Sequence, residues 1–204
     1  MPARVSRLAT ASNIDVAEAA KLVGFSGELT GFSELAFLPS GHGPAKFGDC
    51  LHHTNSKLWV VISGFGILHS CKFYPNKVRA ERMAFHRIYP GCVVSVAPNV
   101  LYSFTFDEPI TLYGSPNDQS DAITHVLGQF APEWRAEMYL QAMVEYSGGT
   151  VESRESIKRF SFPGGKTVIL DSAQMTITCN NESFSFNNEN LSLGLAHVRE
   201  YLGI

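Results

Sequence analysis

The segment HHTNSKLWVVISGFG, residues 52–66, decides the fold prediction because it leads two histidines and a lysine into an apolar run that ends at a glycine turn. Successive side chains of a half-buried strand point to opposite faces. Counting back from the apolar run, one face carries Val61, Trp59, Lys57, Asn55 and His53. His52 falls on the other face. We therefore expect His53 and Lys57 to share a cavity.

A strand-rich region surrounds this segment, from residue 31 to residue 113. Its short β-type runs are separated by turn residues: FSELAFLP, LWVVISG, GILHSCKFY, AFHRIYPG, CVVSVAP, YSFTFDEP and ITLYG. Strands at such regular spacing favour a sandwich or barrel over βαβ units. The sequence therefore predicts a mainly β domain over residues 31–118.

Helical patterns flank this domain. Residues 13–24 start at Asn13 or Asp15 and stop at Gly24, which predicts a helix within an N-terminal helical segment, 1–30. After residue 118, SDAITHVLGQF and PEWRAEMYLQAMVEY read as helices, the second ended by Gly148 and Gly149. A β annex (SIKRFSF, KTVIL, QMTITC, SFSF) and a last helix, NLSLGLAHVREYL, follow. We expect residues 119–204 to pack on the β domain as an extension.

Composition and charge limit the classes of partner that this protein is expected to bind. The chain has 204 residues, 45% of them hydrophobic, and a formal charge of −3, with no long basic run. Phosphate-driven nucleic-acid binding has little support, so a small-molecule partner is expected. The amino terminus lacks the apolar region of a signal peptide, and the apolar run 58–62 is too short to span a bilayer, which predicts a cytoplasmic protein. The four cysteines are widely spaced and are expected to be reduced, packed thiols.

A second segment, PGCVVSVAPNVLYSF at 90–104, complements the first. Turns at Pro90-Gly91 and Pro98-Asn99 bracket the strand CVVSV. After the second turn, alternation places Tyr102, Phe104 and Phe106 on one face.

The two segments together resemble the paired motifs of the cupin superfamily, which are small β-barrels of jelly-roll type. From the first motif the chain keeps His53, the four-residue step to Lys57, and six intervening residues before Gly64. Leu51 stands where the family has its first histidine, and Lys57 where it has a glutamate. The resemblance implies a cupin jelly-roll barrel with flanking helices and a C-terminal β-hairpin annex.

The second motif keeps the family's frame at Pro98, Val100, Ser103 and Phe104, with Tyr102 in the histidine position. One of the four usual metal-ligand positions is therefore retained. An ammonium group at position 57 would repel a cation, so we expect no metal and no other cofactor. A different ligand set stays open, drawn from His52, His53, Asp49, Cys50 and His86.

Metal-free cupins include the dTDP-4-dehydrorhamnose 3,5-epimerases and dTDP-sugar 3,4-ketoisomerases, and residues 47–123 are similar to this group. The resemblance implies an isomerase or epimerase that moves a proton next to the ketone of a nucleotide-linked sugar, such as a dTDP-sugar. His53 would be the base, Lys57 would stabilise the enolate and Tyr102 would return the proton or orient the sugar. Substrate contacts would come from Asn55, Trp59, Phe104 and Phe106.

Two other functions stay open: a non-catalytic cupin that binds a sugar or another small molecule, and a metal-dependent cupin with an unusual ligand set. Purely structural roles also stay open, with His53 bonded to a carbonyl, Lys57 at a strand edge and the aromatic residues in the core. Cupins pair through exposed sheet edges, so the resemblance also implies a homodimer.

Overall fold

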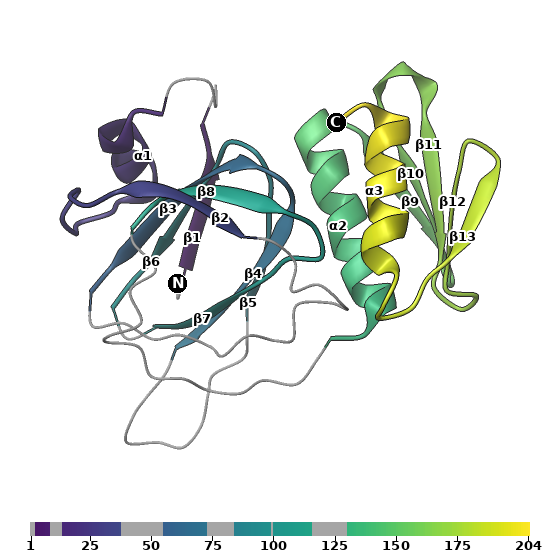
Figure 1. Ribbon diagram of the computed structural model, residues 1–204, viewed down its shortest axis with the longest axis horizontal. Helices are drawn as coiled ribbons and strands as arrows, with labels where there is room; N and C mark the ends of the chain where they lie inside the picture. Colours follow the sequence, from purple (N-terminus) through teal and green to yellow (C-terminus); the bar gives the residue numbers. More distant parts are fainter. Residues whose placement is uncertain (1–2, 9–13, 38–54, 73–83, 99, 116–129) are drawn as a thin grey trace.

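Two antiparallel sheets face each other in the N-terminal part of the chain, as the computed structural model shows for residues 3–8, 14–37, 55–72, 84–98, 100–115 and 130–204 (Figure 1). The larger sheet has the order β1 (Ala3–Arg7), β6 (Cys92–Val96), β3 (Lys57–Ser63), β8 (Ile110–Gly114) and β2 (Ser33–Phe37). The smaller has the order β5 (Ala84–Ile88), β4 (Gly66–Lys72) and β7 (Val100–Thr105). The mainly β prediction is confirmed. A closed barrel is not found among the described strands, which form two separate sheets.

Strand β3 shows why residues 57–63 fold as they do. Trp59 and Val61 point between the two sheets, into a core shared with Leu68 and Tyr102. The alternate residues are buried as well, because helix α1 (Val16–Val23) covers the outer face of the larger sheet. That second cluster contains Leu58, Val60, Val93, Ala19, Ala20 and Val23. An apolar run with no polar alternation is therefore the pattern of a strand covered on both sides.

The N-terminal helix begins and ends at the predicted signals. Asp15 Oδ1 accepts hydrogen bonds from the backbone N–H groups of Ala17 (2.8 Å) and Glu18 (3.2 Å). Gly24 ends the helix with a left-handed backbone, φ +63°. The helical description of segment 1–30 is incomplete, however, because β1 precedes the helix and pairs with β6. The run ARVSR is short and contains one β-branched residue and no aromatic residue, which is too weak a signal to predict a strand.

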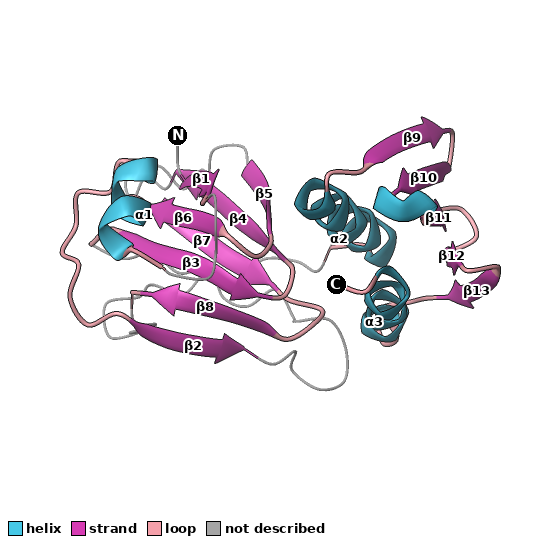
Figure 2. Cartoon of the chain, turned by 90° about the horizontal axis from the view of Figure 1, so that it is seen from above, coloured by secondary structure: helices cyan, strands magenta, loops and turns pink. Residues whose placement is uncertain are grey.

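The C-terminal region is one antiparallel sheet with two helices on a single face (Figure 2). Its helices are α2 (Pro132–Ser147) and α3 (Leu191–Leu202), both of them predicted. Its strands are β9 (Thr150–Arg154), β10 (Ile157–Ser161), β11 (Thr167–Asp171), β12 (Thr176–Cys179) and β13 (Glu182–Ser185), and a 3₁₀ turn spans Pro163–Gly165. Each strand pairs with the next along the chain, so the predicted hairpin annex is a five-stranded meander. β9 was not expected because all of its side chains are exposed and its sequence is largely polar.

The core between this sheet and its helices also reaches the sandwich. Met138, Tyr139 and Met143 are buried in it, together with Phe160 and Val198. Phe65 and Ile67 of the sandwich belong to the same cluster. The extension therefore packs on the smaller sheet through α2. None of the described helices combines the length and the apolar character that a membrane crossing requires.

The described cysteines Cys71, Cys92 and Cys179 are buried free thiols, as expected, and Cys50 lies outside the described residues. Burial raises the pKa of Cys92 to about 11, so this thiol stays protonated at neutral pH.

Buried charges fasten the turn between β7 and β8 to both helices. Asp107 Oδ2 lies 3.2 Å from Arg135 Nε of α2, and Glu108 Oε2 lies 3.3 Å from Arg199 Nη1 of α3. Tyr139 donates its hydroxyl proton to the carbonyl of Thr105 (3.0 Å) and accepts from the N–H of Asp107 (2.5 Å). Asp107 and Glu108 are only 2% and 3% exposed. Burial raises the pKa of Glu108 from 4.5 to about 7, because the lost hydration outweighs the attraction of Arg199.

The raised pKa of Glu108 makes the junction, that is the contact of the β7–β8 turn with α2 and α3, sensitive to pH. The unfolded chain ionises Glu108 near 4.5 and the folded chain near 7. The stability contributed by this group is therefore complete below pH 4.5 and is lost as the pH rises through 7. We expect the free energy of unfolding of Glu108→Gln, relative to that of the parent protein, to rise by about 3 kcal/mol from pH 4 to pH 8. Urea unfolding at each pH measures this difference. Burial lowers the pKa of His69 to about 3, so this group makes the free energy of unfolding rise with pH. The effect is the same in variant and parent, and it cancels when the two are compared. A variant that loses stability relative to the parent above pH 7 would show that the Arg199 attraction dominates.

Gly114 permits the close approach of β8 to β3. A Cβ at this position would lie 2.1 Å from the carbonyl oxygen of Leu58 and 2.8 Å from Cα of Trp59, both of them backbone atoms. We expect Gly114→Ala to lower the free energy of unfolding by about 1–3 kcal/mol in urea unfolding, since the sheet must shift. The matched control is Gly194→Ala inside α3, where the added methyl would meet only Ile177 Cδ1 at 3.8 Å. The control should gain about 0.5–1 kcal/mol, and equal effects of the two substitutions would contradict the steric argument.

Candidate functional site

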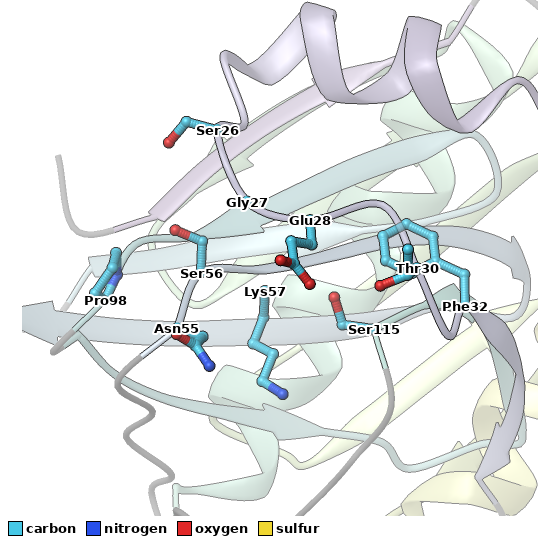
Figure 3. Close-up of a pocket in the computed structure, with 10 residues that line it drawn as sticks. All are labelled: Ser26, Gly27, Glu28, Thr30, Phe32, Asn55, Ser56, Lys57, Pro98 and Ser115. Atoms are coloured by element: carbon cyan, nitrogen blue, oxygen red, sulfur yellow. The ribbon is translucent and has the colours of Figure 1, made fainter.

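A polar pocket of about 570 Å³ opens at the end of the larger sheet where β3 begins (Figure 3). Four separate parts of the chain border it. The loop between α1 and β2 supplies Ser26, Glu28, Thr30 and Phe32. Asn55 and Ser56 come just before β3, Lys57 is its first residue, and Pro98 and Ser115 follow β6 and β8. The site therefore depends on the tertiary fold rather than on one motif.

Backbone pairing fixes the start of β3 at this pocket. Ser115 Oγ accepts a hydrogen bond from the N–H of Leu58 (3.0 Å), and the N–H of Ser115 donates to the carbonyl of Leu58 (2.8 Å). The indole N–H of Trp59 donates to the carbonyl of Ser115 (3.0 Å). Lys57 lies opposite Val96 in the register, two residues from the inward-pointing Trp59, and is half-buried. The hydrogen bonds of Leu58 and Trp59 with Ser115 thus fix the backbone position of Lys57 at the start of β3.

The lining chemistry suits a ligand rich in hydroxyl groups. Ser26, Thr30 and Ser56 carry hydroxyls that both donate and accept hydrogen bonds, and Asn55 adds an amide. Glu28 and Lys57 are the two charged side chains among the described lining residues, and Figure 3 shows them on different segments around the pocket. Their formal charges cancel. The described lining therefore favours a polar ligand without requiring one of high net charge.

The four predicted aromatic residues form one interior cluster. The ring of Trp59 lies 5.3 Å from that of Tyr102 and 5.4 Å from that of Phe104, and Phe104 stacks on Phe106 at 5.5 Å. Trp59 and Tyr102 are each 2% exposed. These rings pack in the core on the same side of β3 as Lys57, and they are not among the described lining residues of the pocket. Burial raises the pKa of Tyr102 well above its usual value, so its phenol keeps its proton at neutral pH.

The structure brings some predicted site residues together and leaves others untested. Asn55 and Lys57 share the pocket. His53, the expected base, lies outside the described residues, as do His52, Asp49 and Cys50. Its placement beside Lys57 therefore stays a prediction.

His86, the remaining member of the alternative ligand set, lies on β5 of the smaller sheet. Burial, reinforced by the nearby Arg87, lowers its pKa, so the imidazole is neutral at pH 7. Within the described ranges, no group of three or more histidine, cysteine or acidic residues is arranged to hold a metal ion.

Apart from Asn55 and Lys57, the described lining residues were not anticipated as site residues from the sequence, among them Glu28, Thr30 and Ser115. The first two lie in a loop without strand or helix periodicity, and that loop reaches the pocket because α1 docks on the outer face of the sheet. Ser115 follows β8 in a turn-like sequence, GSPND. The signal that would have found it is the backbone pairing of β8 with β3, which is a long-range property.

No protein-family model and no curated protein sequence matches this chain. Among solved structures, a dTDP-4-dehydrorhamnose 3,5-epimerase from Elizabethkingia anophelis matches with a TM-score of 0.38 and 10% identity, over 54% of this chain and 64% of the epimerase. The oxalate decarboxylase of Lactobacillus farciminis, in a formate complex, matches with a TM-score of 0.32 and 8% identity, over 74% of this chain and 57% of the decarboxylase.

A third match is Peruvianin-I, a cysteine peptidase from Thevetia peruviana latex, with a TM-score of 0.31 and 20% identity over 48% of this chain and 56% of the peptidase. The chain thus spans less than two thirds of the length of each of these proteins. Their names describe different activities, and at these TM-scores the likeness establishes neither a common family nor a common activity.

Proposed function

We propose that this protein binds a sugar-sized polar molecule in the pocket around Lys57. The observation that carries the proposal is the pocket itself, whose volume of about 570 Å³ is lined by hydroxyls, an amide, one carboxylate and one ammonium group. Small-molecule sites typically enclose roughly 300–1,000 Å³ and use a few directed polar groups for specificity. Hydroxyl-rich linings match the alternating donors and acceptors of a sugar.

We further propose that the domain is a cupin jelly roll and that its ligand is a nucleotide-linked keto sugar. The strand orders β2-β8-β3-β6 and β5-β4-β7 in opposing sheets support the first part, together with the motif resemblance at 47–123. In this reaction His53 takes the proton from the carbon next to the ketone, and the electron pair of the broken C–H bond forms the enolate. The ammonium of Lys57 donates a hydrogen bond to the enolate oxygen, and Tyr102 or water returns a proton to carbon. His53 then releases its proton to solvent, and the donor takes one up from solvent, which restores both groups.

A second candidate is binding without catalysis. The observation that favours it is the packing of Tyr102 against Trp59 and Phe104, which places the expected proton donor in the core rather than among the described lining residues. In this case the pocket binds a sugar and the aromatic cluster has only a packing role in the core.

One experiment separates the two candidates. The full chain is incubated in deuterated water with a dTDP-4-keto-6-deoxy sugar, and both ligand binding and loss of the proton next to the ketone are followed by proton NMR. Binding with deuterium incorporation supports the isomerase or epimerase. Binding without incorporation supports the non-catalytic candidate. Absence of binding to this sugar and to its nucleotide-free form would contradict both.

A further inference from the structure

A second cavity, of about 420 Å³, lies where the sandwich meets the C-terminal region. Its described lining comes from four separate segments and shares no residue with the Lys57 pocket. Arg7 belongs to β1, Tyr146 to the end of α2, Phe162 and Lys166 to the connection between β10 and β11, and Leu202 and Ile204 to the end of α3. The function proposed above makes no use of this cavity.

Arg7 supplies one cationic wall of the cavity. Its guanidinium donates to the carbonyl of Glu145 (3.5 Å) and to that of Tyr146 (3.3 Å), at the C-terminal end of α2. It also lies 5.7 Å from the ring centre of Tyr146 and 5.5 Å from that of Tyr89. These are long hydrogen bonds that use two of the five N–H donors of the group. The remaining donors can serve an anion.

Lys166 supplies the other cationic wall. Its ammonium donates to the carbonyl of Leu202 (3.0 Å) at the end of α3 and lies 5.5 Å from the ring centre of Tyr201. An ammonium has three donors, so this contact orients the group without exhausting it. Both cations are thus fixed in place by carbonyls at helix ends, where the partial negative charge of the helix favours them.

The rest of the described lining is largely apolar. Tyr146, Phe162, Leu202 and Ile204 present ring and aliphatic surface, and Phe162 is only 7% exposed. Acidic side chains are absent from the described lining, so its side chains carry a formal charge of +2, from Arg7 and Lys166. A purely polar anion such as phosphate would leave the apolar walls unmatched, and a neutral apolar molecule would leave both cations unmatched.

From this combination we propose that the cavity binds a small amphipathic carboxylate, with its anionic group between Arg7 and Lys166 and its apolar body against Phe162 and Leu202. The site takes the class of aliphatic or aromatic monocarboxylates. It is independent of the sugar site, because the two pockets have no described residue in common.

Calorimetric titration of the full chain with decanoate, and with decanol as the neutral analogue of equal length, tests the proposal. We expect decanoate to bind at least about tenfold more tightly than decanol, and Lys166→Gln to weaken decanoate binding by about fivefold or more while decanol binding stays unchanged. The control Lys21→Gln, on the exposed face of α1, should leave both affinities unchanged. Equal affinities for the two ligands, or an unaltered decanoate affinity in Lys166→Gln, would overturn the proposal.

A measurement on the unsubstituted protein guards against a folding defect in the variant. Amide and methyl chemical shifts should change with decanoate at Phe162, Lys166, Leu202 and Ile204. Changes centred on Ser26–Phe32 and Asn55–Lys57 instead would place the ligand in the sugar pocket and overturn the assignment.

Discussion

Arg135→Met is expected to lower the free energy of unfolding by about 3–5 kcal/mol, the usual cost of leaving one member of a buried ion pair alone. Arg135 is 1% exposed and Asp107 is 2% exposed, and their charged groups lie 3.2 Å apart. Methionine retains much of the side-chain volume but removes the charge that faces Asp107. It also removes the hydrogen bond from Arg135 Nη1 to the carbonyl of Phe130 (3.3 Å). Urea unfolding at pH 7, followed by tryptophan fluorescence, measures the loss.

The double variant Asp107→Asn with Arg135→Met is the matched control. With no carboxylate left to bury, it should lose clearly less stability than Arg135→Met alone, and the single variant Asp107→Asn completes the cycle that gives the coupling energy of the pair. Burial raises the pKa of Asp107 to about 6 despite the nearby guanidinium, so the penalty of Arg135→Met should shrink at pH 5, where the carboxyl is protonated. A single variant as stable as the parent at pH 7 would show that this pair does not hold the junction.

Local signals in the sequence were sufficient for most of the elements. Asp15, Gly24 and Gly148 marked helix ends by their capping chemistry, and the structure places each of them at such an end. Two-residue alternation from Trp59 to Val61 identified the inward face of β3. These features depend on a few neighbouring residues, which is why a single sequence reveals them.

Features that depend on distant partners were not predictable in the same way. β1 is a strand because it pairs with β6, some ninety positions away in the chain, and its own residues carry little strand signal. Asp107 and Glu108 stand at the end of the β-type run YSFTFDEP with no local sign of burial, yet they are buried because Arg135 and Arg199 come to them from two helices. Charged residues rarely occupy such positions unless they are paired, and sequence alone does not display the pairing.

The same difference between local signals and distant partners applies to the residues of the candidate site. Lys57 and Asn55 were expected on one face of β3 and they do share a pocket. Glu28 and Ser115 reach that pocket only through the docking of α1 and the pairing of β8 with β3. The structure packs the rings of Trp59, Tyr102 and Phe104 on one another, and the contact with substrate that was expected of them stays a prediction. Alternation predicts the face of the strand on which a side chain lies, but it does not predict how deeply that side chain is buried.

Lys57→Met should reduce proton exchange into the keto sugar by about 100-fold or more, because loss of one preorganised donor to a developing oxyanion has an effect of this size. Lys57 lines the pocket from the first position of β3, and methionine preserves most of its unbranched stem while removing the ammonium. The parent and variant are compared by the initial rate of deuterium incorporation at several sugar concentrations. A fall in kcat with little change in KM would assign the ammonium to the enolate, whereas a rise in KM alone would assign it to ligand binding.

Two variants make this comparison decisive. Lys57→Arg keeps a positive charge and should retain more exchange than Lys57→Met, although the planar guanidinium places its donors differently. Lys21→Met removes an exposed lysine of α1 outside the described pocket lining and should leave exchange unchanged. If a folded Lys57→Met protein, verified by its unfolding midpoint, exchanged the proton as fast as the parent, the enolate role of Lys57 would be wrong. The pocket would then be a binding site whose chemistry, if any, lies with other groups.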